Sequence, residues 1–149
     1  MPFLVTETVG VQTQISEGNE MAKKRAFISF DYHNDEGAKI MLAGQAKHED
    51  SPFDFKDNSV DYHLTGDWQD KVKRRMDNID VVIVLCGHKT HTAAGVAAEL
   101  RIAKEKGKPY FLLAAYSDGK CTKPTSASSD DSIYKWSWDN LKKLIGGAR

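Results

Sequence analysis

A continuous apolar run near the middle of the chain constrains the fold more than any other stretch. The segment Val-Val-Ile-Val-Leu-Cys occupies residues 81–86, follows Asp80 and stops at Gly87. Unbroken apolarity in so short a segment is typical of a strand that is buried on both faces, as in a parallel sheet covered by helices. The run therefore predicts a central strand of an α/β protein.

A helix and a second apolar strand are predicted directly after this run. The polar connection over residues 87–92 contains threonines, and one of them is expected to cap a helix over residues 93–106. Residues 108–115 then give another apolar segment. The three segments form a strand–helix–strand unit, and such units close with a right-handed crossover almost without exception.

Glu99 is the most informative polar residue of this predicted helix. At about 100° per residue, it lies on the arc that packs against the sheet. A carboxylate on that arc is unexpected, and a surface glutamate paired with Arg101 or Lys106 is the alternative interpretation. The apolar residues of the same arc are Val96, Leu100, Ile102 and Ala103.

The remaining segments alternate between strand-like and helix-like patterns. Such alternation predicts a flavodoxin-like three-layer sandwich with a central, mostly parallel five-stranded sheet. Trp68, Trp136 and Trp138 are expected to fill its core. The expected elements are a strand over residues 25–30, a helix over about 36–47 that buries Ile40, Met41 and Ala43, a short strand over 51–56, a helix from Trp68 to Ile79, an edge strand over 132–136 and a last helix capped by Ser137.

Length and charge set the class of protein. The 149 residues are enough for one domain, expected over residues 23–149, with residues 1–22 as a flexible N-terminal tail that lacks a patterned apolar face. The 21 basic and 21 acidic residues cancel, which gives no electrostatic case for nucleic acid or an anionic membrane. Two cysteines make no disulfide framework, and Cys86 is expected to be an inert core thiol. A cytoplasmic protein is expected.

The loops after the strands hold the residues that could do chemistry. In doubly wound sheets, ligands bind outside the carboxyl ends of the strands, which here are residues 30–36, 55–65 and 87–92. No Gly-x-Gly-x-x-Gly or Walker-type lysine loop is present, so a dinucleotide-binding Rossmann site and a P-loop are not expected. The histidines match no zinc spacing, and no metal is expected.

The order of short motifs resembles the TIR-like family that includes the TIR proteins of Thoeris antiphage defence. The resemblance covers roughly residues 25–115 and, more loosely, Tyr134–Trp138. The motifs are Phe27-Ile28-Ser29-Phe30, Phe53-Asp54-Phe55, Trp68 at the start of a helix, Val81–Gly87 with Thr90, the helix bearing Glu99, and Gly107-Lys108-Pro109.

This resemblance implies a TIR fold and cleavage of the nicotinamide–ribose bond of NAD, which is a substrate and not a cofactor. Glu99 matches the catalytic glutamate of the family, whereas Gly95 stands where many TIR enzymes carry tryptophan. A partner effector that senses the nucleotide product is implied, and a homo-oligomer is compatible with it. A non-catalytic TIR-like interaction or nucleotide-sensing module is the alternative. The expected substrate-binding residues are Phe30, Asp31, His33, Phe55, Asp57, Trp68, His88 and Thr90.

Overall fold

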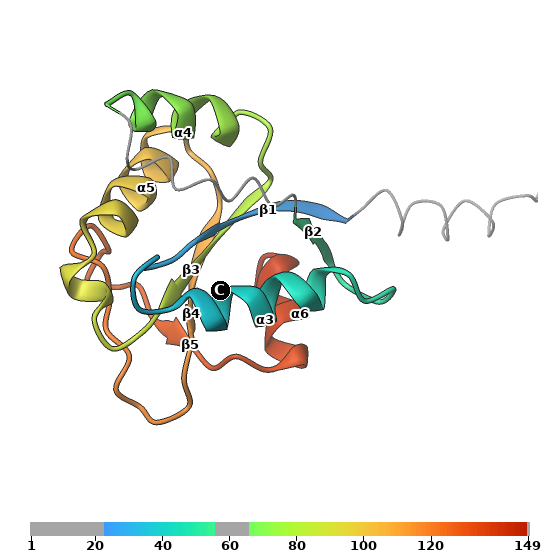
Figure 1. Cartoon of the computed structure of the whole chain (residues 1–149). Helices are drawn as coiled ribbons and strands as arrows, with labels where there is room; N and C mark the ends of the chain where they lie inside the picture. Colours follow the sequence, from blue (N-terminus) through green and yellow to red (C-terminus); the bar gives the residue numbers. More distant parts are fainter. Residues whose placement is uncertain (1–22, 56–65, 149) are drawn as a thin grey trace, which may run out of the picture.

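The computed structural model describes residues 23–55 and 66–148, in which five parallel strands form one sheet with helices on both sides (Figure 1). The strand order is β2-β1-β3-β4-β5, the flavodoxin-like arrangement. The predicted α/β fold class is therefore confirmed. The strands are β1 (Lys24–Ser29), β2 (Phe53–Phe55), β3 (Val81–Cys86), β4 (Tyr110–Ala114) and β5 (Ile133–Tyr134).

Strand β3 lies at the centre of the sheet because every one of its side chains is apolar. It pairs with β1 on one side, where Ser29 lies opposite Val84, and with β4 on the other. All of its residues are buried. Burial raises the pKa of the Cys86 thiol to about 12, in agreement with the expectation of an inert core thiol.

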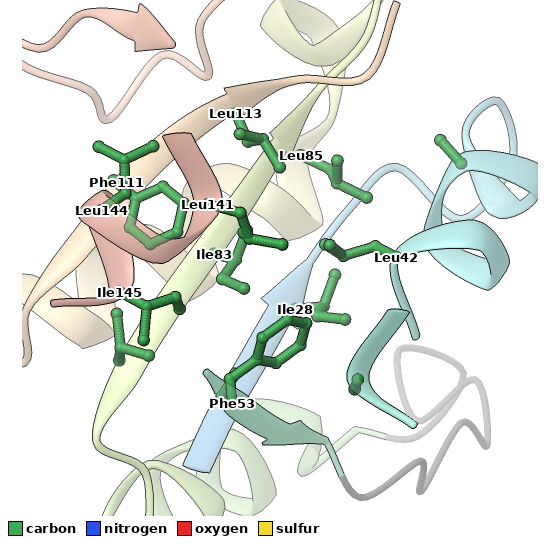
Figure 2. Close-up of a cluster of buried hydrophobic side chains, with 14 residues drawn as sticks. Ile28, Leu42, Phe53, Ile83, Leu85, Phe111, Leu113, Leu141, Leu144 and Ile145 are labelled. Atoms are coloured by element: carbon green, nitrogen blue, oxygen red, sulfur yellow. The ribbon is translucent and has the colours of Figure 1, made fainter. Parts of the chain in front are cut away.

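Two pairs of helices cover the two faces of the sheet (Figure 1). Helices α3 (Glu36–Ala46) and α6 (Trp138–Ile145) contribute to the core on one face, which includes Ile83 and Phe111 (Figure 2). Helices α4 (Trp68–Met76) and α5 (Ala94–Glu105) contribute to the core on the other face. The alternation of side chains along β1 sends Ile28 to the first core and Phe27 to the second.

The predicted buried face of α3 is wrong. Ile40 and Met41 are 59% and 68% exposed, while Leu42 and Lys39 are buried. The Lys39 ammonium lies 5.7 and 5.6 Å from the ring centroids of Phe30 and Phe55. Apolar residues occur on several sides of this helix, so the sequence pattern does not show which side faces the core. Lys39 can be buried because its aliphatic stem is apolar and its ammonium group lies near the two aromatic rings.

The expectations about helix caps and about the tryptophans are met only in part. No threonine caps α5: its N-cap is Ala93 without a side-chain hydrogen bond, because Thr90–Thr92 form a separate 3₁₀ turn, η2. Ser137 does cap α6, and its Oγ accepts a hydrogen bond from the Asn140 backbone N–H. Trp68, Trp136 and Trp138 are only half-buried at the margins of the two cores.

Two sequence-based expectations concern segments outside the described residues. The N-terminal tail over residues 1–22 and the loop that contains Asp57 belong to these segments. Within residues 23–55 and 66–148, no helix has both the length and the apolarity needed to cross a membrane.

Candidate functional site

The carboxyl ends of β1 and β3 lie side by side and mark the topological switch point of the sheet. The chain leaves β1 toward α3 on one face and leaves β3 toward α5 on the other. In open α/β sheets, ligands bind in the crevice at this point, because the connections diverge there and leave space between them. The polar residues near the two strand ends are therefore the first candidates for a site.

Glu99 projects from α5 toward the end of β1 and is 3% exposed. The Ser29 hydroxyl, on the last residue of β1, donates a 2.7 Å hydrogen bond to Glu99 Oε1. Glu99 is on the buried arc of α5, as the helical periodicity predicts. The interpretation as a surface glutamate is wrong, because Glu99 is buried. Arg101 contacts Glu105 of the same helix, and Lys106 bonds Asp77.

Asp31 organises the loop that follows β1. It is buried, and its Oδ1 and Oδ2 accept hydrogen bonds from the His33 backbone N–H at 3.1 Å and the Asn34 amide at 2.6 Å. The Asp31 carbonyl oxygen also accepts from the Asp35 backbone N–H at 2.8 Å. Both carboxylate oxygens of Asp31 thus bond within their own loop, and His33 remains exposed at the surface.

A further buried carboxylate, that of Asp35, was not predicted from the sequence. The Tyr116 hydroxyl, just after β4, donates a 2.8 Å hydrogen bond to Asp35 Oδ1. Asp35 Oδ2 has no hydrogen-bond partner among the described residues, and burial raises the pKa of this carboxyl. The bond to Asp35 raises the pKa of Tyr116 to about 12. Asp35 precedes a helix in the sequence, which suggests only an N-cap, and yet its side chain makes no cap hydrogen bond.

The loop after β3 is held close to this carboxylate. A Cβ atom added to Gly87 would lie 2.3 Å from the Asp35 carboxylate oxygens, so only glycine fits there. The Gly87 backbone N–H donates a 2.7 Å hydrogen bond to the hydroxyl of Thr90, which is fully buried. The predicted binding residue Thr90 therefore shapes the loop from within.

His88 is exposed at the same edge and contacts two residues from the segment after β4. Its Nε2 donates to Asp118 Oδ2 at 2.7 Å, and its ring lies against Tyr116 with the centroids 4.8 Å apart. The Lys120 backbone N–H, and secondarily the His88 ring, lower the pKa of Asp118. This carboxylate is thus kept charged beside the imidazole.

The predicted aromatic residues do not gather on one wall. Phe30 and Phe55 pack on the side of α3, with Lys39 over both rings. Trp68, the first residue of α4, packs against the core on the opposite face of the sheet. The site residues that the structure does bring together are those at the ends of β1 and β3.

The fold and the buried glutamate beside the switch point define an α/β domain of the TIR-like class. The family model described as "Thoeris protein ThsB, TIR-like domain" matches residues 27–121, from β1 to the loop after β4. The chain belongs to this family. No curated protein matches the chain. Membership of the Thoeris TIR-like family supports a role in antiphage defence.

Proposed function

We propose that the chain is an NAD-consuming enzyme that cleaves the nicotinamide–ribose bond and makes an ADP-ribose-derived signal, in linear or cyclic form. The observation that carries this proposal is the buried carboxylate of Glu99, bonded to Ser29 where β1 ends. Burying a carboxylate costs free energy, and a protein of ordinary stability keeps such a group where function needs it.

The chemistry requires one carboxylate. When the C1′–N bond breaks, its electron pair goes to the cationic nicotinamide ring, which leaves as a neutral molecule and needs no general acid. The ribose becomes oxocarbenium-like, as in glycoside cleavage. A fixed carboxylate beside the ribose stabilises the developing positive charge, and the Ser29 hydroxyl fixes the Glu99 side chain. Water or a group of the same nucleotide then adds to C1′.

The partner, the location and the binding residues are also part of this proposal. An effector protein that senses the nucleotide product is the proposed partner, and the protein acts in the cytoplasm. The residues proposed to contact the dinucleotide are Phe30, Asp31, His33, Phe55, Asp57, Trp68 and His88. Thr90, which is fully buried, is proposed to act by shaping the loop that carries His88.

The test is Glu99→Gln, which keeps the shape of the side chain and removes its charge. We expect nicotinamide release from NAD to fall by a factor of about 10²–10³, as for the loss of one electrostatic stabiliser. The melting temperature should not fall, because the amide oxygen can still accept from Ser29. Glu105→Gln is the matched control: Glu105 lies on the same helix, is exposed and should leave the rate unchanged. Equal rates for wild type and Glu99→Gln would refute the role of Glu99.

A non-catalytic nucleotide-sensing module is the second candidate. Gly95 favours it, because this residue on α5 offers no side chain to a substrate one helical turn before Glu99. This candidate predicts that the purified protein binds NAD or its products and releases no nicotinamide, even after addition of a phage lysate. Turnover by wild type that is lost in Glu99→Gln would exclude it.

A further inference from the structure

Three loops meet at the buried carboxyl group of Asp35. This residue ends the loop after β1, is 2% exposed and packs against Gly87, which follows β3. Its Oδ1 accepts a hydrogen bond from Tyr116, which follows β4. The loops after three adjacent strands are thus joined by one side chain that lies 81 residues from Tyr116 in the sequence.

This arrangement costs free energy. Asp35 Oδ2 has no hydrogen-bond partner among the described residues, and a buried polar atom left in this state costs about 1–3 kcal/mol. Asp31 and His88 also act on the group, since the charge of Asp31 disfavours ionisation of Asp35 and that of His88 favours it. The other oxygen, Oδ1, is the acceptor that holds the Tyr116 hydroxyl, so the side chain joins the loops at this cost.

The visible consequence of the Asp35–Tyr116 bond is a fixed pair of rings at the surface. Tyr116 is held by its hydroxyl, and its ring lies against the His88 ring with 33° between the planes. His88 Nε2 bonds Asp118, so a hydrogen bond holds each of the two side chains. His88 remains exposed beside Gly87, at the carboxyl edge of the central strand.

The ring pair is placed within reach of a nucleotide bound at Glu99. Ser29, which bonds Glu99, lies opposite Val84 in the sheet. His88 is four residues further along the chain than Val84, which corresponds to at most about 14 Å. A nucleotide with its ribose at Glu99 can therefore extend along the edge of the sheet toward the two rings.

We propose that His88 and Tyr116 form a stacking platform for the planar heteroaromatic base of a nucleotide, and that Asp35 is a positioning residue that acts through Tyr116. This rests on the proposed nucleotide substrate. Aromatic rings that already have a fixed orientation lose little conformational entropy when a base stacks on them. Asp35 keeps the ring of Tyr116 in place, and Gly87 leaves the space that the carboxyl group needs.

The test compares the binding of AMP with that of ribose 5-phosphate, which lacks the base. Loss of a stacking ring in Tyr116→Leu should raise the Kd for AMP about 5- to 150-fold and leave that for ribose 5-phosphate unchanged. Asp35→Ala frees the Tyr116 ring and should weaken AMP binding by a smaller factor. Asp35→Asn keeps an oxygen acceptor for the Tyr116 hydroxyl and should restore wild-type binding.

Tyr110→Phe is the matched control. Tyr110 also bonds an aspartate, Asp131, but lies at the start of β4 and thus at the other edge of the sheet. The substitution removes a tyrosine–aspartate hydrogen bond far from the ring pair and should leave the Kd for AMP unchanged. The platform is overturned if wild type does not bind AMP, if Tyr116→Leu binds AMP as wild type does, or if it loses AMP and ribose 5-phosphate equally.

Nicotinamide release from NAD, measured in parallel, separates this inference from the proposed function. Base-dependent AMP binding through Tyr116 without NAD cleavage would keep the platform and refute the enzyme. NAD cleavage with the same KM in wild type, Tyr116→Leu and Asp35→Ala would keep the enzyme and refute the platform.

Discussion

Glu99 and Asp35 are two of the three carboxylates that are buried near the ends of β1 and β3 among the described residues, and their surroundings hold them in different ways. Glu99 receives a hydrogen bond from Ser29, whereas Asp35 has one oxygen bonded by Tyr116 and the other without a partner among the described residues. A hydrogen bond stabilises the charged form of a buried carboxylate, and a partnerless oxygen raises the cost of burying it. Loss of the Ser29 hydroxyl that bonds Glu99 should therefore lower stability, and loss of the ionisable group of Asp35 should raise it.

Ser29→Ala is expected to lower stability. It removes the hydroxyl that donates to the buried Glu99 carboxylate, and a hydrogen bond to a charged group contributes about 1.5–3 kcal/mol. Urea unfolding monitored by circular dichroism measures the change. Ser132→Ala, which truncates an exposed serine, is the control and should stay within about 0.5 kcal/mol of wild type. A Ser29→Ala variant as stable as this control would show that the bond contributes nothing.

Asp35→Asn is expected to raise stability in a way that depends on pH. Burial raises the pKa of Asp35 in the folded protein above its value of 3.8 in an unfolded chain. The favourable contribution of its protonated form is therefore complete below pH 3.8 and is lost as the pH rises through the folded-state pKa. Asparagine has no such loss.

The melting temperatures of wild type and Asp35→Asn, compared at pH 4 and pH 7, test this. The variant should melt higher at pH 7, by an amount on the order of 1 kcal/mol in free energy, and its advantage should shrink toward pH 4. An advantage of equal size at both pH values would mean that ionisation of Asp35 has no part in it.

At the scale of the elements, the sequence predicted burial correctly where the pattern of apolar residues allows only one way of packing. The unbroken apolar run of β3 fits only a fully buried strand, and the single apolar arc of α5 placed Glu99 correctly. Helix α3 has apolar residues on several sides, so periodicity could not show that Leu42 faces the core and Met41 faces solvent. The Asp35–Tyr116 bond joins loops without periodicity, and only the folded sheet brings them together.

The orientation of α3 can be tested by truncating neighbouring residues. Leu42→Ala should cost about 2–5 kcal/mol, because it leaves a cavity in a core that includes Ile28 and Phe53 (Figure 2). Met41→Ala should change stability by less than about 0.5 kcal/mol, since the Met41 side chain is largely exposed. Chemical denaturation gives both values, and similar costs for the two variants would contradict the observed orientation.

At the scale of the whole molecule, the buried carboxylates of Asp31, Asp35 and Glu99 all lie near one position, the switch point between β1 and β3. This position follows from the strand order. Strand β1 lies between β2 and β3, so the chain after β1 and the chain after β3 cross over in opposite directions along the sheet and therefore on opposite faces. The sequence predicted the strand order and the edge of the sheet at which the candidate residues lie. It did not predict which polar residues face one another there, since that depends on the loops and not on the sheet.

The same strand order predicts how stability is distributed over the molecule. Strand β3 is hydrogen-bonded to a neighbour on both sides and covered by a helical layer on both faces, whereas β2 and β5 are short and each pairs with one strand only. Amides that open only in global unfolding should therefore lie in β3 and in the parts of β1 and β4 that pair with it. Native-state hydrogen exchange measured by mass spectrometry should show slowest exchange for the peptide that contains Val82–Leu85, and faster exchange for those that contain Phe53–Phe55 or Ile133–Tyr134. If either edge strand exchanged as slowly as β3, the stability would not follow the topology of this sheet.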